Sequence, residues 1–203
     1  MRSMTDIPAD PNGIRARIRR YERKLQQEKR EWGAYHDGAG KRYFIGPLYL
    51  LMGDLAGAVQ SFHWFAQEFP DDSGDPGQYL CWTLAMYRAG HVHEAVSKLR
   101  EAMLQNRFLL PRLLGRNVEG LGISPDSDEL EMMRLDHIPE EYFAIWGERE
   151  LLWASTHTTE SSPPCGHATL RSSESSNMCR PPLCPGTRRR GHNHRARRKR
   201  HGS

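Results

Sequence analysis

The residues whose types are best suited to bind a metal lie near the end of the sequence, where cysteine and histidine recur. The segments CGH, CRPPLC and HNH supply six possible zinc ligands: Cys165, His167, Cys179, Cys184, His192 and His194. Thiolate and imidazole are the usual ligands of structural zinc. Their spacings match no common zinc finger, however, and the segment lacks apolar side chains to pack around a metal. We therefore expect no metal site and no cofactor.

No other group of residues predicts catalysis. The segment GAGKR at 38–42 resembles part of a phosphate-binding loop, but Tyr35 and Arg42 stand where that motif requires Gly and Ser or Thr. A flexible linker is the simpler interpretation. His91 and His93 are two residues apart, a spacing that directs them to different sides of a helix. No side chain lies in a recognisable nucleophile context, so we predict that the protein is not an enzyme.

Charge is divided unevenly along the 203 residues. Residues 155–203 contain ten Lys/Arg and two acidic residues, whereas residues 1–154 contain 19 basic and 23 acidic residues, a net charge of −4. This asymmetry predicts a folded body and a chemically distinct tail. The sequence shows no secretory signal and no apolar run of the roughly 18 residues that span a membrane. A lone core cysteine, Cys81, suits a reducing compartment. We expect a cytoplasmic protein that does not bind membranes.

Hydrophobic spacing divides the N-terminal part into a lead and a helix. Residues 1–12 are polar and contain proline, and we expect a flexible lead. From residue 13 to residue 33 the apolar side chains recur every three, four or seven positions: Ile14, Ile18, Tyr21, Leu25 and Trp32. This spacing predicts one amphipathic helix with a single stripe to bury. We expect the helix at 13–33 to cap the N-terminal end of the domain.

The next segment predicts two helical hairpins. Between residues 43 and 69 two apolar runs flank Gly53-Asp54, a pair that suits the end of one helix and the start of the next. The same pattern returns around Gly90, 37 residues after Gly53. A repeat of this length indicates stacked hairpins. The pattern in residues 116–154 then predicts a linker, followed by a C-terminal helix that begins near Pro139.

The hairpin residues resemble the tetratricopeptide repeat family. In the first copy the family pattern falls on Ile45, Gly46, Tyr49, Gly53, Ala58, Phe62, Phe65 and Pro70. In the second copy it falls on Trp82, Thr83, Met86, Gly90, Ala95, Leu99 and Ala102, with departures at Thr83 and Met86 and with Arg107 in place of the closing proline. The resemblance covers residues 41–115. It implies an all-α fold in which antiparallel hairpins stack as a short solenoid.

The same resemblance implies a function. Such repeats bind a peptide or a partner protein in a concave groove lined by the first helix of each hairpin. Here the implied groove residues are Tyr43, Pro47, Leu50, Leu80, Leu84, Tyr87 and Arg88, with Lys41 and Arg42 at the rim. Aliphatic and aromatic groups with one cation suit an extended or helical apolar ligand. An alternative is that the helix at 13–33 itself fills the groove, because an apolar patch needs a cover.

Residues 155–203 have no hydrophobic periodicity, and we expect this tail to be disordered. Eight of its cations form a block without acidic residues: Arg188, Arg189, Arg190, Arg195, Arg197, Arg198, Lys199 and Arg200. Such a block attracts polyanions. A nucleic-acid-associated protein, bound without sequence preference through the tail, is therefore the alternative function. A shifted reading frame after residue 154 is a further explanation of the tail.

Overall fold

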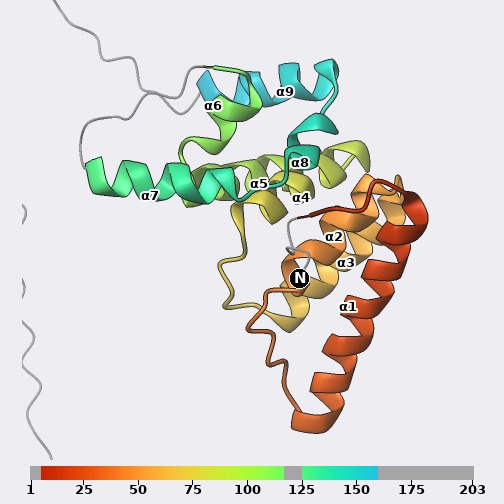
Figure 1. Cartoon of the computed structure of the whole chain (residues 1–203). Helices are drawn as coiled ribbons and strands as arrows, with labels where there is room; N and C mark the ends of the chain where they lie inside the picture. Colours follow the sequence, from red (N-terminus) through yellow and green to blue (C-terminus); the bar gives the residue numbers. More distant parts are fainter. Residues whose placement is uncertain (1–5, 117–124, 160–203) are drawn as a thin grey trace, which may run out of the picture. The chain divides into compact units, whose positions relative to one another are not determined.

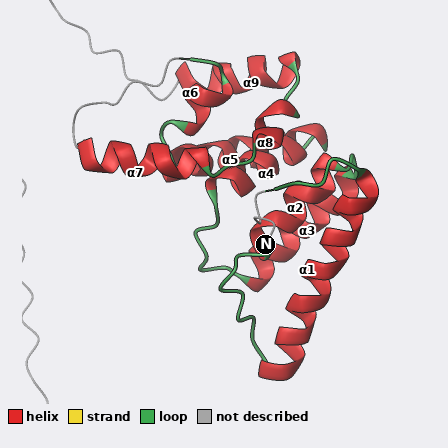
Figure 2. Cartoon of the chain, in the orientation of Figure 1, coloured by secondary structure: helices red, strands yellow, loops and turns green. Residues whose placement is uncertain are grey.

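The structure, a computed structural model, describes residues 6–116 and 125–159. Within these two ranges every regular element is an α-helix (Figures 1 and 2), which confirms the predicted all-α class. The helices are α1 (Pro11–Trp32), α2 (Arg42–Leu51), α3 (Leu55–Glu68), α4 (Pro76–Arg88), α5 (Val92–Gln105), α6 (Leu109–Leu113), α7 (Pro125–Asp136), α8 (Glu140–Ala144) and α9 (Glu148–Thr159). None of these described helices is long and apolar enough to cross a membrane.

Several sequence-level predictions fall outside the described ranges. They include residues 1–5 of the predicted lead, the six candidate zinc ligands and the eight polyanion-binding cations of the tail. Residues 11 and 12, also assigned to the lead, belong to α1. The boundary at residue 154 is testable, however, because α9 continues to Thr159. Residues 155–159, which the sequence assigns to the tail, therefore belong to α9.

The two glycine bends have the same backbone conformation. Gly53 has a φ of 80° and Gly90 a φ of 82°, in the left-handed region that favours glycine. In the first bend the N–H of Asp54 donates to the carbonyl of Tyr49 at 3.0 Å, and in the second the N–H of His91 donates to the carbonyl of Met86 at 2.9 Å. Both bonds span five residues, the signature of a Schellman turn. The prediction that these glycines mark equivalent bends is confirmed.

Aspartate side chains fix the start of three helices. Asp10, Asp54 and Asp75 accept hydrogen bonds from backbone N–H groups in the first turns of α1, α3 and α4. The distances are 2.8 Å to Gly13, 2.8 Å to Gly57 and 2.9 Å to Gly77. Each bond satisfies a donor that the helix itself leaves without a partner, which is worth about 1 kcal/mol.

The two hairpins, α2–α3 and α4–α5, are joined by an aromatic stack. A Cβ built on Gly46 of α2 would lie 2.4 Å from the ring of Phe62 on α3, so only glycine leaves room for that ring. Phe62 in turn stacks on Trp82 of α4, with ring centroids 5.2 Å apart and planes 8° from parallel. Tyr79 stacks on Trp82 at 5.6 Å, and Lys98 of α5 lies 4.1 Å from the Trp82 ring. Trp82 therefore links α3, α4 and α5.

Helix α1 covers the outer side of α2 as a cap. Its apolar stripe packs in a second core cluster with Ile45 and Leu48 of α2. Tyr21 and Phe44 meet edge to face at 6.5 Å. The predicted stripe is buried except for Trp32, which is 69% exposed at the end of the helix.

The C-terminal region differs from the prediction. The single helix expected from Pro139 is two helices, because the helical hydrogen bonding stops at Ile145 and restarts at Glu148. Glu150 accepts the N–H of Gly147 at 2.6 Å and so stabilises the new start. In addition, α7 occupies part of the predicted linker. A proline at its first position, Pro125, was the sequence signal for this helix.

Replacing Gly46 by Ala tests the contact between α2 and Phe62. The added methyl group would clash with the ring, and overpacking of a core costs about 1–3 kcal/mol. The higher helix propensity of alanine offsets at most about 1 kcal/mol of this. We expect a lower melting temperature, measured by circular dichroism.

The matched control is Gly38→Ala. A methyl group added to Gly38 would have no heavy atom within 4 Å, and the φ of this residue is not positive. We therefore expect stability to change by no more than about 0.5 kcal/mol. A Gly46→Ala protein as stable as Gly38→Ala would contradict the close packing of Phe62 on α2.

Candidate functional site

The predicted groove, the face formed by α2 and α4, is covered by the chain's own C-terminal part. Helix α8 contacts both α2 and α4 (Figure 1). A Cβ on Gly77 of α4 would lie 3.1 Å from Ile138 and 3.2 Å from the ring of Tyr142, so both side chains lie directly on the α4 backbone. Tyr142 and Trp146 belong to the same core cluster as Leu80 and Leu84. We call this arrangement the α8 seat.

Helix α9 extends the same contact to the C-terminal end of α4. The Nε of Arg88 donates to Glu150 at 2.9 Å, and a terminal nitrogen of Arg88 donates to the carbonyl of Ile145 at 2.7 Å. The rings of Tyr87 and Trp153 are 4.5 Å apart. Burial opposes ionisation of Glu150, but the Arg88 guanidinium and the N–H of Gly147 outweigh it and lower the pKa of Glu150.

The structure thus accounts for each predicted groove residue. Pro47, Leu50, Leu80 and Leu84 are buried within the chain. Tyr43 is half-buried, and Tyr87 and Arg88 contact α9. The alternative prediction named the wrong cover: α1 packs on α2 in a separate cluster, and α8 occupies the face shared by α2 and α4. The role of these residues in binding a partner stays a prediction.

The two predicted rim cations are also engaged within the chain. Lys41 contacts Asp37 at 2.6 Å and Glu28 at 3.3 Å. The Nε of Arg42 donates to Asp72 at 2.7 Å, and the backbone N–H of Arg42 donates to Asp37 at 2.8 Å. This network ties the loops before α2 and after α3 together. Both cations therefore hold the fold together, and their role at a ligand site stays a prediction.

Burial and neighbouring charges have opposite effects on the pKa values of the carboxyl groups in this network. Burial alone would raise the pKa of Asp37, but the Lys41 ammonium and the backbone N–H of Arg42 hold it below its usual value. The pKa of Asp72 is lowered in the same way by the N–H of Gly74 and by Arg42. Burial and the hydrogen bond to Asp72 raise the pKa of Tyr43 to about 12. At neutral pH the network consists of ionised carboxylates, cations and a neutral phenol.

Two polar atoms in the α8 seat are buried without a hydrogen-bond partner in the described part of the chain. They are the hydroxyl of Tyr142 and the Nε1 of Trp146. Burial raises the pKa of Tyr142 well above its ordinary value, and the thiol of Cys81 and the carboxylate of Asp75 act on it in the same direction. Leaving a buried donor unpaired costs about 1–3 kcal/mol. The α8 seat is therefore well packed but incompletely hydrogen-bonded.

A cavity of about 280 Å³ lies between α1, α2 and α3, away from the predicted groove. Its wall includes the rings of Tyr35, Tyr49 and Trp64. The hydroxyl of Tyr49 donates to Glu22 of α1 at 2.8 Å across this wall. These residues come from three helices and the loop before α2, so their spacing in the sequence gives no signal of a shared cavity.

Neither comparison with known proteins nor the arrangement of possible metal ligands indicates a reaction or a cofactor. Comparison with family models, curated proteins and solved structures found no match. Among residues 6–116 and 125–159, no cluster of His, Cys, Asp or Glu is arranged to hold a metal ion. His63 and His91 each lie near Glu94, at 3.4 Å and 3.9 Å, on the surface of the α3–α5 side. The α8 seat remains the feature that most resembles a recognition site.

Replacing Asp37 by Asn tests the rim network through its pH dependence. Because the pKa of Asp37 is lower in the folded chain than its usual 3.8, its ionised form stabilises the fold at neutral pH. Hydrogen bonds to charged groups contribute about 1.5–3 kcal/mol, so we expect the variant to lose that much at pH 7. As the pH falls below about 4 the wild type loses this contribution, and the two unfolding free energies should converge.

Urea denaturation at pH 7, 4 and 3 measures this difference. The control is Asp71→Asn, which removes the same charge from an exposed neighbour of the network. A stability difference between Asp37→Asn and wild type that stays constant from pH 7 to pH 3 would show that Asp37 does not act through its charge.

Proposed function

We propose that this chain is a non-enzymatic interaction module of the cytoplasm, built from tetratricopeptide-like hairpins. It binds a short aromatic segment of a protein on the face formed by α2 and α4. The observation that carries the proposal is the α8 seat, in which a five-residue helix lies on α2 and α4 as a bound peptide would. The resemblance of residues 41–115 to a peptide-binding repeat family supports the same role.

The α8 seat defines the chemistry of the partner. Tyr142 lies on α8, and Trp146 follows four residues later, beyond the end of that helix. Both aromatic side chains are buried and act as the two anchors of the segment. Glu150 follows after a further four residues and pairs with Arg88. A partner of this class carries two aromatic anchors and a carboxylate after them. The aromatic anchors supply most of the binding energy in such interfaces.

The chain's own segment around α8 can be displaced from the face because its hydrogen bonding is incomplete. Its two unpaired polar atoms, the Tyr142 hydroxyl and the Trp146 Nε1, each reduce the stability of the closed form. A partner segment whose polar groups are all hydrogen-bonded does not lose this free energy, so it binds the face more strongly than α8 does. The apparent affinity for such a partner is reduced by the fraction of time that α8 occupies the face.

A peptide supplied in trans tests this proposal. The probe is a fluorescein-labelled peptide of residues 137–153, titrated with the full chain and followed by anisotropy. The double variant Tyr142→Ala, Trp146→Ala vacates the face, and we expect it to bind the peptide at least about tenfold more tightly than wild type, because wild type must first release its own segment. A milder opening, Glu150→Ala, removes the partner of Arg88 and should give an intermediate affinity.

The control is the same peptide with alanine at the positions of Tyr142 and Trp146, which should not bind. Circular dichroism establishes that each variant keeps its helices. Absence of binding to folded variants, or equal binding of the alanine peptide, would overturn the proposed role of this face.

A further inference from the structure

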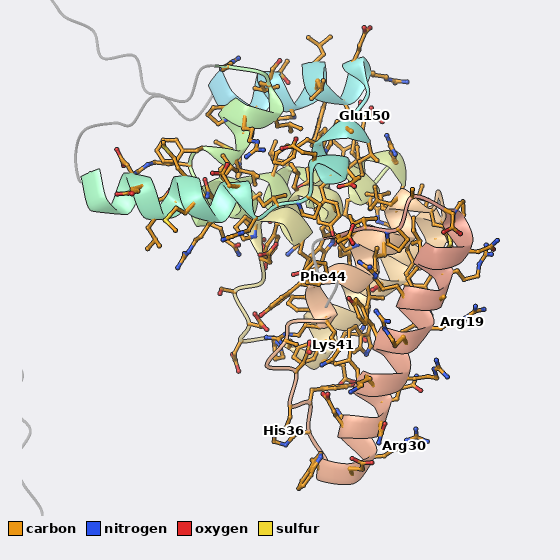
Figure 3. The ribbon with its side chains drawn as sticks, in the orientation of Figure 1. Arg19, Arg30, His36, Lys41, Phe44 and Glu150 are labelled. Atoms are coloured by element: carbon orange, nitrogen blue, oxygen red, sulfur yellow. The ribbon has the colours of Figure 1, made fainter. Side chains whose placement is uncertain are left out.

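The outer face of α1 is a row of arginines. Five of them are exposed: Arg15, Arg19, Arg20, Arg23 and Arg30. At 100° per residue they lie within an arc of about 140° on the side opposite the buried stripe. Figure 3 shows Arg19 and Arg30 pointing away from α2. We call these five residues the arginine face.

The charge of the arginine face is not neutralised by acidic neighbours in the described part of the chain. Arg15 contacts the side-chain oxygen of Asn12 at 3.3 Å, and Arg23 and Arg30 donate to backbone carbonyls of α1 at 3.2 and 3.3 Å. Arg20 lies over the ring of Tyr21. The ion pair of α1 that reaches another helix is made by Lys29 with Glu68, beside this face. The positive charge of the five guanidinium groups is therefore exposed to solvent and available to a ligand.

The rest of the body has the opposite charge. Residues 11–32 contain eight Lys/Arg and three Glu, a net charge of +5. Because residues 1–154 have a net charge of −4, the part outside α1 carries −9. Within residues 1–154, α1 is therefore a basic helix on an otherwise acidic body, and its local field favours a polyanion at α1 over the rest of that body.

The spacing and the residue type suit phosphates. Arg15 and Arg30 are 15 residues apart, which corresponds to about 22 Å along a helix. One strand of a duplex presents a phosphate about every 3.4 Å, so this length matches roughly six phosphates. Of the six exposed cations of α1 that have no acidic partner among the described residues, five are arginine and the other is Lys24. The planar guanidinium can donate two parallel hydrogen bonds to a phosphate, which an ammonium cannot.

We propose that the arginine face of α1 binds the phosphate backbone of a nucleic acid without sequence preference. This site goes beyond the proposed peptide function and is independent of the tail. A membrane surface fits less well, because an interfacial helix inserts its apolar face and that of α1 is buried on α2. The contact is electrostatic and has no base readout, so its strength depends on salt.

Two triple variants of the full chain test the proposal. Arg19→Gln, Arg23→Gln, Arg30→Gln changes the arginine face. Arg100→Gln, Arg134→Gln, Arg149→Gln removes the same charge from three exposed arginines on α5, α7 and α9. Both variants keep the tail, so its contribution to binding is common to all three proteins. The probe is a 24-base-pair DNA duplex of mixed sequence, titrated between 50 and 300 mM NaCl.

We expect the slope of log affinity against log salt to become shallower by about 2.7 in the α1 variant, since each duplex phosphate contact contributes about 0.9. The control variant should change the slope by less than about 0.5. Equal changes in the two variants would show that net charge alone acts, and would overturn the proposal.

Two further measurements assign the face to another polyanion if the proposal is wrong. Binding to phosphatidylserine vesicles that is lost in the α1 variant, while DNA binding is unchanged, would make the ligand a membrane. Salt-dependent self-association that is lost in the same variant, again with unchanged DNA binding, would make it the acidic surface of a second copy. Retained melting temperatures establish that neither triple variant acts by unfolding.

Discussion

The arrangement of the hairpins depends on a missing side chain at residue 46. Because Gly46 has no Cβ, the ring of Phe62 can approach the α2 backbone closely while it stacks on Trp82. Trp82 is covered on its other sides by Tyr79, Phe65 and Lys98. This contact sets the distance between α2 and α3 and, through Trp82, between the first and second hairpins. The face formed by α2 and α4 exists because this stack fixes the two helices beside each other.

What could be predicted from the sequence was local. Gly53 and Gly90 specify their bends through backbone conformations that few other residues adopt, and each bend involves only neighbours in the chain. Gly46, Ala58 and Ala95 mark close approaches between helices for a different reason: each lacks a large side chain, and all three are buried. The cover of the groove could not be found this way, because Tyr142 lies 65 residues from Gly77 in the sequence. An amphipathic pattern shows that α8 has an apolar side but not which surface it meets.

The rim cations illustrate a second limit. The resemblance to the repeat family places Lys41 and Arg42 at the rim of the groove, and nothing in the sequence pattern points to their partners within the chain. Asp37 and Asp72 are those partners, and both belong to irregular segments on either side of the first hairpin. A charge pattern alone does not distinguish a cation held by a buried carboxylate from a free one. On α1 the contacts support exposed charge instead: among the described residues, the side chains of Arg23 and Arg30 donate only to carbonyls of their own helix.

The two proposed surfaces are separate because α1 and α8 use different sides of α2. The buried stripe of α1 packs on Ile45 and Leu48, whereas α8 lies where α2 meets α4. Arg19 and Arg30 of the arginine face point away from α2 (Figure 3). A peptide that replaces α8 therefore leaves the packing of α1 unchanged, and a polyanion on α1 leaves the α8 seat closed. Coupling between two sites requires an element with two arrangements that both ligands bias. The structure has one arrangement of α1 on α2, with the apolar stripe of α1 buried on Ile45 and Leu48. We therefore expect the two surfaces to act independently, so that both ligands can be held at once.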